Sequence, residues 1–316
     1  MNIFCNSDLV RHDPRFEVFN GQKYDHADKP TRIDSILTQL DSSFQVSESN
    51  QDLQIKLLKQ VHDSEYIDFL INYQNPERTY PSIYNYSQYL HLTPAKELIN
   101  LSNYCFDTFT PFSSDIWSIV KESAELALSA MDCTYNDNKV SYALCRPPGH
   151  HASIAAQELL NRGKKVCILD IDYHHGNGAQ EIWYESDQVL TISIHRDEQF
   201  PYFSGKESEK GFGLGLGFNH NFMFGEAVEE EEYLTILQKA LQVAKSKNVD
   251  YIIVSAGFDT YYQDPICDAK LKIETYHKIA KEIRQLNIAT IILQEGGYHI
   301  GDLGKCVNSF LKGFDS

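Results

Sequence analysis

The sequence predicts an α/β fold: a single domain over residues 1–316, in which a mostly parallel central sheet carries helices on both faces. Three observations lead to this class. From about residue 139 onward, short apolar runs alternate with helical segments. These runs are almost continuously apolar, as is typical of strands covered on both faces. The 316 residues contain no repeat, low-complexity linker or long Gly/Ser tract, so one large domain is expected.

The first third of the chain is polar and rich in tyrosine, and we expect two helices before the sheet region. An amphipathic helix should follow Pro30. Its apolar face consists of Ile33, Ile36, Leu37 and Leu40. A longer helix is predicted over 114–131.

The remaining two thirds supply the predicted sheet and its covering helices. The expected strands are 140–145, 165–171, 189–194, 250–256 and 289–294. The expected helices are 152–163, 233–246 and 275–286.

Composition and charge exclude several classes of function. The formal net charge is −16, which disfavours a nucleic-acid partner and suits either solubility or cationic ligands. Seven cysteines without CxxC spacing, among them Cys145 and Cys167 in apolar runs, indicate reduced core thiols in a cytoplasmic protein. The first residues lack a basic, apolar leader pattern, and no apolar run has transmembrane length. We therefore expect neither secretion nor a membrane partner.

Unusual polar residues follow the predicted strands, always at their carboxyl ends. They are Arg146–His151, Asp170, Asp172, His195, Asp259 and Glu295–Tyr298. In open α/β sheets, ligand sites form at this edge, so these side chains are expected to share one site.

Three of these residues form a candidate metal site. Asp172 and His174 are two apart in a segment expected to be extended, so their side chains should point the same way. Asp259, after another strand, could converge on them. Two carboxylates and one imidazole leave a position open, as in catalytic zinc sites, and Fe²⁺ or Co²⁺ would also suit them. The alternative is that the aspartates are helix caps or turn formers.

Two further groups could complete a hydrolytic site. His150 and His151 follow Pro-Pro-Gly in a rigid turn and could act as general base and general acid, with Asp170 and Asn177 orienting them. One of these histidines could instead be an ordinary buried residue. Tyr298 lies on a Gly-Gly turn, where its phenol could stabilise an oxyanion, or it could be an ordinary turn aromatic.

Five motifs in this order resemble the histone deacetylase superfamily, in particular its acetylpolyamine amidohydrolase-like bacterial branch. They are RPPGHHA, DIDYHHGNG, SIHRDEQFPYFSG, SAGFD and EGGY. The segments HDPRFEVFNGQKYDHADKPTRIDSI and VHDSEYIDFL are also similar to that family, the second to one of its helices. The resemblance covers nearly the whole chain and implies an arginase/deacetylase-like sheet.

The resemblance also implies roles for individual residues. The metal ligands, for zinc above all, would be Asp172, His174 and Asp259. A structural potassium ion would lie near Asp170, Asp172, His174, Ser193 and Ile194. The catalytic set would be His150, His151, Tyr298, Asp170 and Asn177. The substrate channel would include Phe203, Gly149 and Gly297.

The implied reaction is hydrolysis of an amide that links an acetyl or similar acyl group to an amine. The metal would polarise the carbonyl and activate water, His151 would take the proton, and Tyr298 would hold the oxyanion. The expected substrate is a small acetylated amine, such as an acetylpolyamine, or an acetyl-lysine peptide. A homodimer would be compatible with this assignment.

Two rival interpretations remain. The first is a ureohydrolase, which would need two more aspartates to bind a second metal. Those two positions hold Gly176 and Tyr261, so a ureohydrolase is only a remote alternative. The second rival is a catalytically impaired homologue. The family's Gly-rich aromatic loop after PGHHA is absent here, and ASIAAQELLNRG follows His151 at once. Such a deletion would draw the helix start toward His151 and put the geometry of the histidine pair in doubt.

Overall fold

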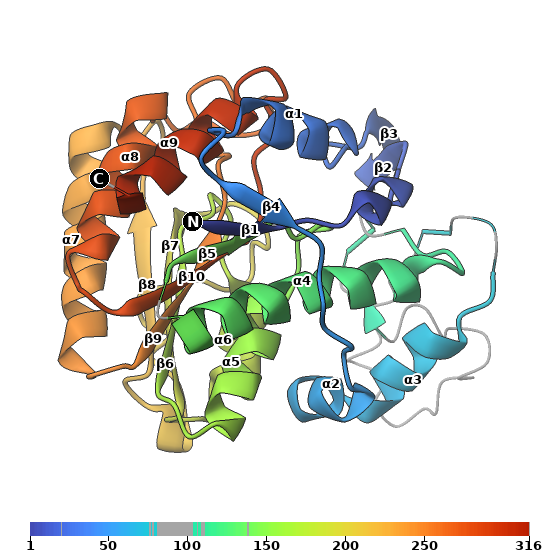
Figure 1. The fold of residues 1–316 in the computed structure, drawn as a ribbon, viewed down its shortest axis with the longest axis horizontal. Coiled ribbons are helices and arrows are strands. Elements are labelled where there is room, and N and C mark those ends of the chain that lie inside the picture. Colours follow the sequence, from blue (N-terminus) through green and yellow to red (C-terminus); the bar gives the residue numbers. More distant parts are fainter. Residues whose placement is uncertain are drawn as a thin grey trace.

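An eight-stranded sheet forms the centre of the protein (Figure 1). The structure, a computed structural model, describes residues 1–19, 21–75, 77, 79–80, 104–105, 107–108, 111–137 and 139–315. In spatial order the strands are β4 (Gln45–Ser47), β1 (Asn2–Phe4), β5 (Ser141–Ala143), β10 (Ala289–Gln294), β9 (Tyr251–Ala256), β6 (Val166–Asp170), β7 (Val189–Arg196) and β8 (Asn219–Phe224). Neighbouring strands of this sheet pair in parallel, which confirms the predicted fold class.

Helices cover both faces of the sheet (Figure 1). One layer contains α1 (Thr31–Gln39), α7 (Glu230–Ser246), α8 (Ile273–Arg284) and α9 (Leu303–Asp315). The other contains α4 (Ile116–Asp137), α5 (His151–Asn161) and α6 (Asn177–Trp183). Two shorter helices, α2 (Ile55–Val61) and α3 (Ser64–Asn72), pack beside α5 and α4. Among the residues that the structure describes, no helix is long and apolar enough to cross a lipid bilayer.

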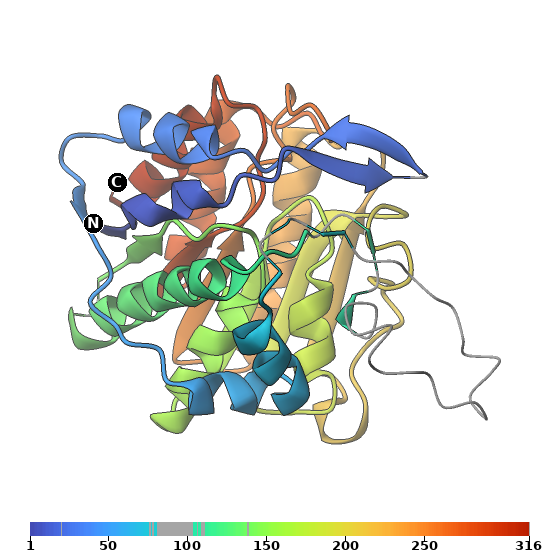
Figure 2. The same cartoon turned by 90° about the vertical axis from the view of Figure 1, so that its right-hand side faces the viewer.

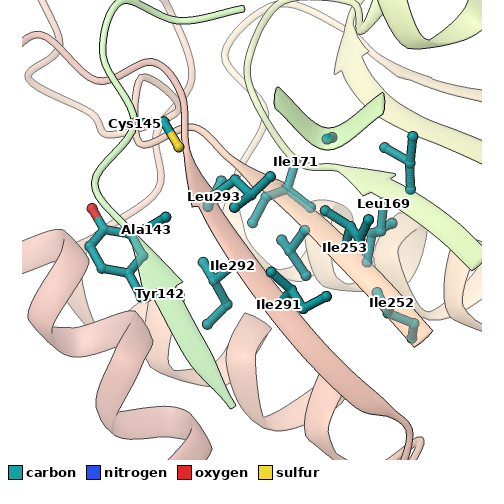
Figure 3. Close-up of a cluster of buried hydrophobic side chains, with 14 of the residues drawn as sticks. Tyr142, Ala143, Cys145, Leu169, Ile171, Ile252, Ile253, Ile291, Ile292 and Leu293 are labelled. Atoms are coloured by element: carbon teal, nitrogen blue, oxygen red, sulfur yellow. The ribbon is translucent and has the colours of Figure 1, made fainter. Parts of the chain in front are cut away.

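The core lies between the sheet and these layers. Figure 3 shows part of it, with Tyr142, Ala143, Leu169, Ile252, Ile253, Ile291, Ile292 and Leu293. All of these side chains are buried, including neighbours in sequence that point to opposite faces of the sheet. The apolar runs show no polar alternation because helices cover both faces.

The N-terminal region differs in part from the sequence-based expectation. Ile33 and Ile36 of α1 are buried as predicted, but Leu37 is 36% exposed and lines a surface groove with Val10 and Val46. Strands β1 and β4 were not predicted, because three-residue strands carry too short a pattern. An antiparallel hairpin of β2 (Phe16–Phe19) and β3 (Gln22–Asp25) was also not predicted; Figure 2 shows it, in blue, extending from the body.

The register of the parallel strands brings their carboxyl ends to one edge. Asp170, the last residue of β6, pairs with Ser193 of β7 and with Ser255 of β9. The segments that follow β6, β9 and β10 therefore leave the sheet side by side. This edge holds the candidate site.

Candidate active site

The three predicted metal ligands meet at this edge. The His174 Nδ1 atom lies 3.1 Å from Asp172 Oδ1 and 3.1 Å from Asp259 Oδ2. Ligand atoms bound at about 2.0–2.1 Å around a tetrahedral zinc ion are separated by roughly 3.3 Å. The two measured separations are close to this value, and the metal site itself stays a prediction.

A bend, not an extended strand, brings Asp172 and His174 together. Strand β6 ends at Asp170, whose carboxylate accepts a hydrogen bond from Asp172 N at 3.0 Å. The Asp172 carboxylate in turn accepts one from His174 N at 2.8 Å. The expected extended alternation is therefore wrong at this point, because carboxylates that bond to backbone N–H groups two residues on favour a turn.

Backbone donors fix the two carboxylate ligands. Asp259 is fully buried and accepts a hydrogen bond from Tyr173 N at 2.9 Å, while Asp172 accepts one from Gly296 N at 2.8 Å. Gly296 comes so near that a Cβ there would lie 2.4 Å from Asp259 Oδ2 and 2.5 Å from Asp172 Oδ2. Only glycine lets the backbone approach both carboxylates this closely.

The electrostatics of this cluster suit a cation. Burial, and then the charge of Asp172, raise the pKa of Asp259 to about 7, and burial with Asp172 also raises the pKa of Asp170. Burial by itself would lower the pKa of His174. The hydrogen bonds and negative charges of Asp172 and Asp259 together have the larger effect, so the pKa of His174 is raised to about 10. Buried carboxylates gathered around one point need a positive charge between them. A divalent ion would supply it, with donor atoms of types that zinc binds.

The predicted potassium ligands lie beside the metal ligands. Ser193 is the β7 partner of Asp170, and its hydroxyl accepts a hydrogen bond from Gly176 N at 3.2 Å. The same hydroxyl bonds to His195 Nδ1 at 2.9 Å, and Ile194 is completely buried. The potassium site itself stays a prediction.

The histidine pair lies at the junction of β5 and α5. His151 is the first residue of α5, as expected if the connecting loop is missing, and His150 is its N-cap. His151 is 5% exposed, and its buried Nδ1 atom has no hydrogen-bond partner among the residues that the structure describes. The ring of His150 stacks on His62 with 5.3 Å between centroids and lies against Gly178.

The predicted orienting role of Asp170 and Asn177 stays a prediction. Within the described part of the chain, no hydrogen bond joins His150 or His151 to Asp170 or Asn177. Asp170 instead accepts its bond from Asp172 N, and Asn177 is the first residue of α6.

The two imidazoles are neutral near pH 7. Although the residue as a whole is exposed, its ring lies against His62 and Gly178; this desolvation, and then the charge of His62, lower the pKa of His150 to about 4. Burial, and then the charges of His150 and His62, lower the pKa of His151 to about 3. Both rings are therefore unprotonated at neutral pH, as a general base must be, but their low pKa values make them weak bases.

The loop that carries Tyr298 is held by a buried arginine. Arg32 donates to Gly297 O at 2.7 Å and to Glu295 O at 2.5 Å, and its guanidinium carbon lies 5.0 Å from the Tyr298 ring centroid. Asp264 accepts a hydrogen bond from Tyr298 N at 2.7 Å. Burial raises the pKa of Tyr298 well above its usual value, so its phenol keeps its proton.

A single carboxylate joins this loop to the histidine turn. Asp28 Oδ1 accepts hydrogen bonds from Arg32 Nη1 at 2.7 Å and from Arg146 Nε at 3.0 Å. Burial would raise the pKa of Asp28, but the two arginines lower it. This network was not predicted from the sequence, because nothing in the pattern shows that Arg32 and Arg146 are buried.

The predicted channel residues lie around the same edge. Gly149 N donates to Glu295 Oε2 at 3.1 Å, which links the histidine turn to the EGGY motif. Phe203 is 66% exposed, and its place as a channel wall stays a prediction. The ring of Phe200, which was not singled out in the sequence, lies 6.2 Å from that of His174.

Comparison with known proteins agrees with this geometry. A model of the histone deacetylase domain matches residues 26–314. The chain is 33% identical over 340 aligned positions to acetylpolyamine amidohydrolase 2 of Pseudomonas aeruginosa, covering 100% of this chain and 99% of that protein. It is 30% identical over 350 positions to the acetylpolyamine amidohydrolase of Mycoplana ramosa, with 99% of each chain covered. The crystal structure of an acetylpolyamine aminohydrolase from Burkholderia pseudomallei superposes with a TM-score of 0.93 at 29% identity, covering 100% and 99% of the two chains.

Both alignments with relatives are longer than the 316 residues of this chain, so the relatives contain residues without a counterpart here. That agrees with a missing loop, although the alignment lengths do not locate it. The motifs, the sheet and the full-length similarity lead to one conclusion: the chain belongs to the histone deacetylase family.

Proposed function

We propose that this protein is a metal-dependent amidohydrolase that removes acetyl or similar acyl groups from amines. The observation that carries the proposal is the convergence of Asp172, His174 and Asp259, with both separations from the imidazole nitrogen at 3.1 Å. The proposed ion is Zn²⁺, with Fe²⁺ or Co²⁺ as alternatives, since all accept mixed oxygen and nitrogen ligands. A potassium ion near Asp170 and Ser193 is proposed as a structural cation.

A bound divalent ion supplies Lewis-acid chemistry at the carbonyl of the scissile amide. The chain supplies the remaining groups. The neutral imidazole of His151 accepts the proton of the attacking water, and the departing amine receives a proton in turn. Tyr298 retains its phenolic proton and donates a hydrogen bond to the developing oxyanion. Arg32 fixes the backbone of the loop that presents Tyr298.

The proposed substrates are cationic acetylated amines, acetylpolyamines first and acetyl-lysine peptides second. The net charge of −16 favours a cationic substrate over an anionic one. The names of the full-length relatives from Pseudomonas aeruginosa and Mycoplana ramosa support acetylpolyamines.

The alternative proposal is a family member that binds metal but hydrolyses amides weakly. It is favoured by the immediate start of α5 at His151 and by the buried Nδ1 of that residue, which has no partner. A catalytic group displaced by about 1 Å can cost on the order of a hundredfold in rate.

One experiment tests both proposals. The purified protein is assayed on acetylated diamines, acetylpolyamines and acetyl-lysine peptides, before and after chelation and after re-addition of Zn²⁺, Fe²⁺ or Co²⁺. The main proposal expects chelator-sensitive release of acetate that a metal restores. Stoichiometric metal with very slow acetate release would support the impaired homologue, and activity unchanged by chelation would contradict metal dependence.

A further inference from the structure

A cysteine lies beside the metal ligands and has no part in the proposed reaction. A thiol sulfur on Cys267, an imidazole nitrogen of His174 and a carboxylate oxygen of Asp259 all lie within 4.8 Å of one another. Cys267 is half-buried and forms no disulfide. The group therefore adds a sulfur donor to a centre otherwise built from oxygen and nitrogen.

The turn that carries Cys267 is held on both sides. Before it, the Asp264 carboxylate accepts hydrogen bonds from Ile266 N at 3.2 Å and Tyr298 N at 2.7 Å. After it, the Asp268 carboxylate accepts one from the Tyr173 hydroxyl at 2.8 Å and one from Arg196 Nε at 3.3 Å. Because both neighbouring carboxylates are bonded to other segments of the site, the backbone of Cys267 has a fixed place beside the ligands.

The separation is within reach of one ion. Around zinc, with bonds of about 2.3 Å to sulfur and 2.0–2.1 Å to nitrogen or oxygen, two ligand atoms lie roughly 3.3–3.8 Å apart. Relative to His174 and Asp259, the Cys267 sulfur needs to move by little more than about 1 Å, and rotation about its Cα–Cβ bond moves it further than that.

We propose that Cys267 is an auxiliary sulfur ligand of the metal centre, which takes the position left open by Asp172, His174 and Asp259 when no substrate occupies it. As the metal–sulfur bond forms, the thiol proton passes to solvent and no other bond breaks. The resulting four-ligand set is closed, as in structural zinc sites, and a substrate or oxygen-donor ligand must displace the sulfur. The inference rests on the proposed metal centre and adds a resting state to it. A thiolate also favours zinc or cadmium over oxygen-preferring manganese.

The test uses Co²⁺ as the probe and absorption spectra as the readout. Thiolate ligation gives a sulfur-to-cobalt charge-transfer band in the near ultraviolet, whereas the visible bands report cobalt binding with any ligands. The wild-type protein loaded with Co²⁺ should show both features. Cys267→Ser and Cys267→Ala should lose the ultraviolet band and keep the visible ones. The matched control is Cys133→Ser, which removes a half-buried thiol of α4 and should leave both features unchanged.

Two additions sharpen the result. Acetohydroxamate, a small oxygen-donor ligand, should abolish the ultraviolet band of the wild type. Alkylation by iodoacetamide, followed by mass spectrometry, should be slowed by metal at Cys267 and unchanged at Cys133. Cobalt uptake with identical spectra for wild type and Cys267→Ser would overturn the sulfur ligand alone. A wild-type protein that takes up no cobalt would overturn the metal centre as well, so the two failures are distinguishable.

Discussion

The two halves of the candidate site are built differently. The metal half consists of side chains that follow β6 and β9, and backbone N–H groups bond its carboxylates at 2.8–3.0 Å. The histidine half lies between β5 and α5, where His151 begins the helix and its Nδ1 atom has no partner in the described part of the chain. Backbone donors hold the carboxylates of one half, whereas no hydrogen bond to Nδ1 holds the His151 ring of the other.

The difference shows what a parallel sheet fixes and what it does not. Strand register determines where the residues after β6 and β9 leave the sheet, so the metal ligands need no long loop to meet. The histidines depend on the length of the connection that follows them, which the sheet does not constrain. We therefore expect a missing loop to disturb the histidine half and to leave the proposed metal ligands in place.

The variant Asp259→Ala is the strongest test of the metal half of the site. Removal of this fully buried ligand should abolish stoichiometric metal binding and, with it, all acetate release. Metal content is measured by elemental analysis of the purified variant. The control Asp268→Asn changes a nearby carboxylate that bonds Tyr173 and Arg196 instead, and should keep its metal. Full metal retention in Asp259→Ala would remove this residue from the ligand set.

The next largest effect is expected at the oxyanion. Tyr298→Phe should lower turnover on the order of a hundred- to a thousandfold, with little change in KM, because one transition-state donor is worth about 2.7–4 kcal/mol. Steady-state kinetics on the best substrate measure both constants. Tyr24→Phe, on the exposed β3 strand, is the matched control. An unchanged kcat in an active protein would exclude Tyr298 from this role.

Repair of the histidine half should act in the opposite direction. A Gly- and aromatic-containing loop inserted after Ala152 should let α5 begin later and raise turnover on the order of a hundredfold, while metal content stays constant. A Gly/Ser insertion of equal length is the control. It also lets α5 begin later but adds no aromatic side chain, so the difference in turnover between the two insertions measures the contribution of the aromatic residue. The prediction is contradicted if the unmodified chain, with its mass confirmed, already has a turnover comparable to that of its full-length relatives. The histidine pair would then be correctly placed without the loop.

The link between the halves is tested at Asp28. This side chain is 6% exposed and bridges Arg32 and Arg146, so Asp28→Asn leaves two buried cations without their counter-charge. The free energy of unfolding should fall by about 3–5 kcal/mol, and turnover should fall while metal content persists. Urea unfolding measures the first quantity. Asp34→Asn, at an exposed position of α1, is the control and should change neither.

The smallest expected effect concerns pH. The pKa of His151 is about 3 in the folded chain and about 6.5 when unfolded, so the unfolded state binds more protons between these values. The stability associated with a neutral His151 is complete above pH of about 6.5 and is lost as the pH falls. The free energy of unfolding of the unmodified protein should therefore fall between about pH 7 and about pH 5. In His151→Asn this fall should be smaller by up to about 2 kcal/mol. Urea titrations of chelated protein check this, and equal slopes in both proteins would contradict it.

Much of the fold and of the metal half could be predicted from the sequence, for physical reasons. Doubly covered strands leave continuous apolar runs, and the polar residues after them mark one edge, so the neighbourhood of Asp172, His174 and Asp259 followed from the pattern. The start of α5 at His151 followed from the absence of a loop. The partners of Asp28 lie up to 118 residues away, and Cys267 follows a Pro-containing turn, so neither produces a periodic signal. Leu37 shows the limit of periodicity, since a helix stripe does not tell which of its edges faces solvent.

The position of β10 in the sheet has a consequence for how the protein is synthesised. This strand inserts between β5 and β9, although it lies near the end of the described chain. Until residues 289–294 emerge from the ribosome, β5 and β9 each expose an unpaired edge, and such edges favour aggregation. Gly296, the donor that completes the hydrogen bonding of Asp172, emerges later still. The nascent chain therefore contains all three proposed metal ligands for some time before their final arrangement can form, so the proposed site can be completed only at the last stage of translation.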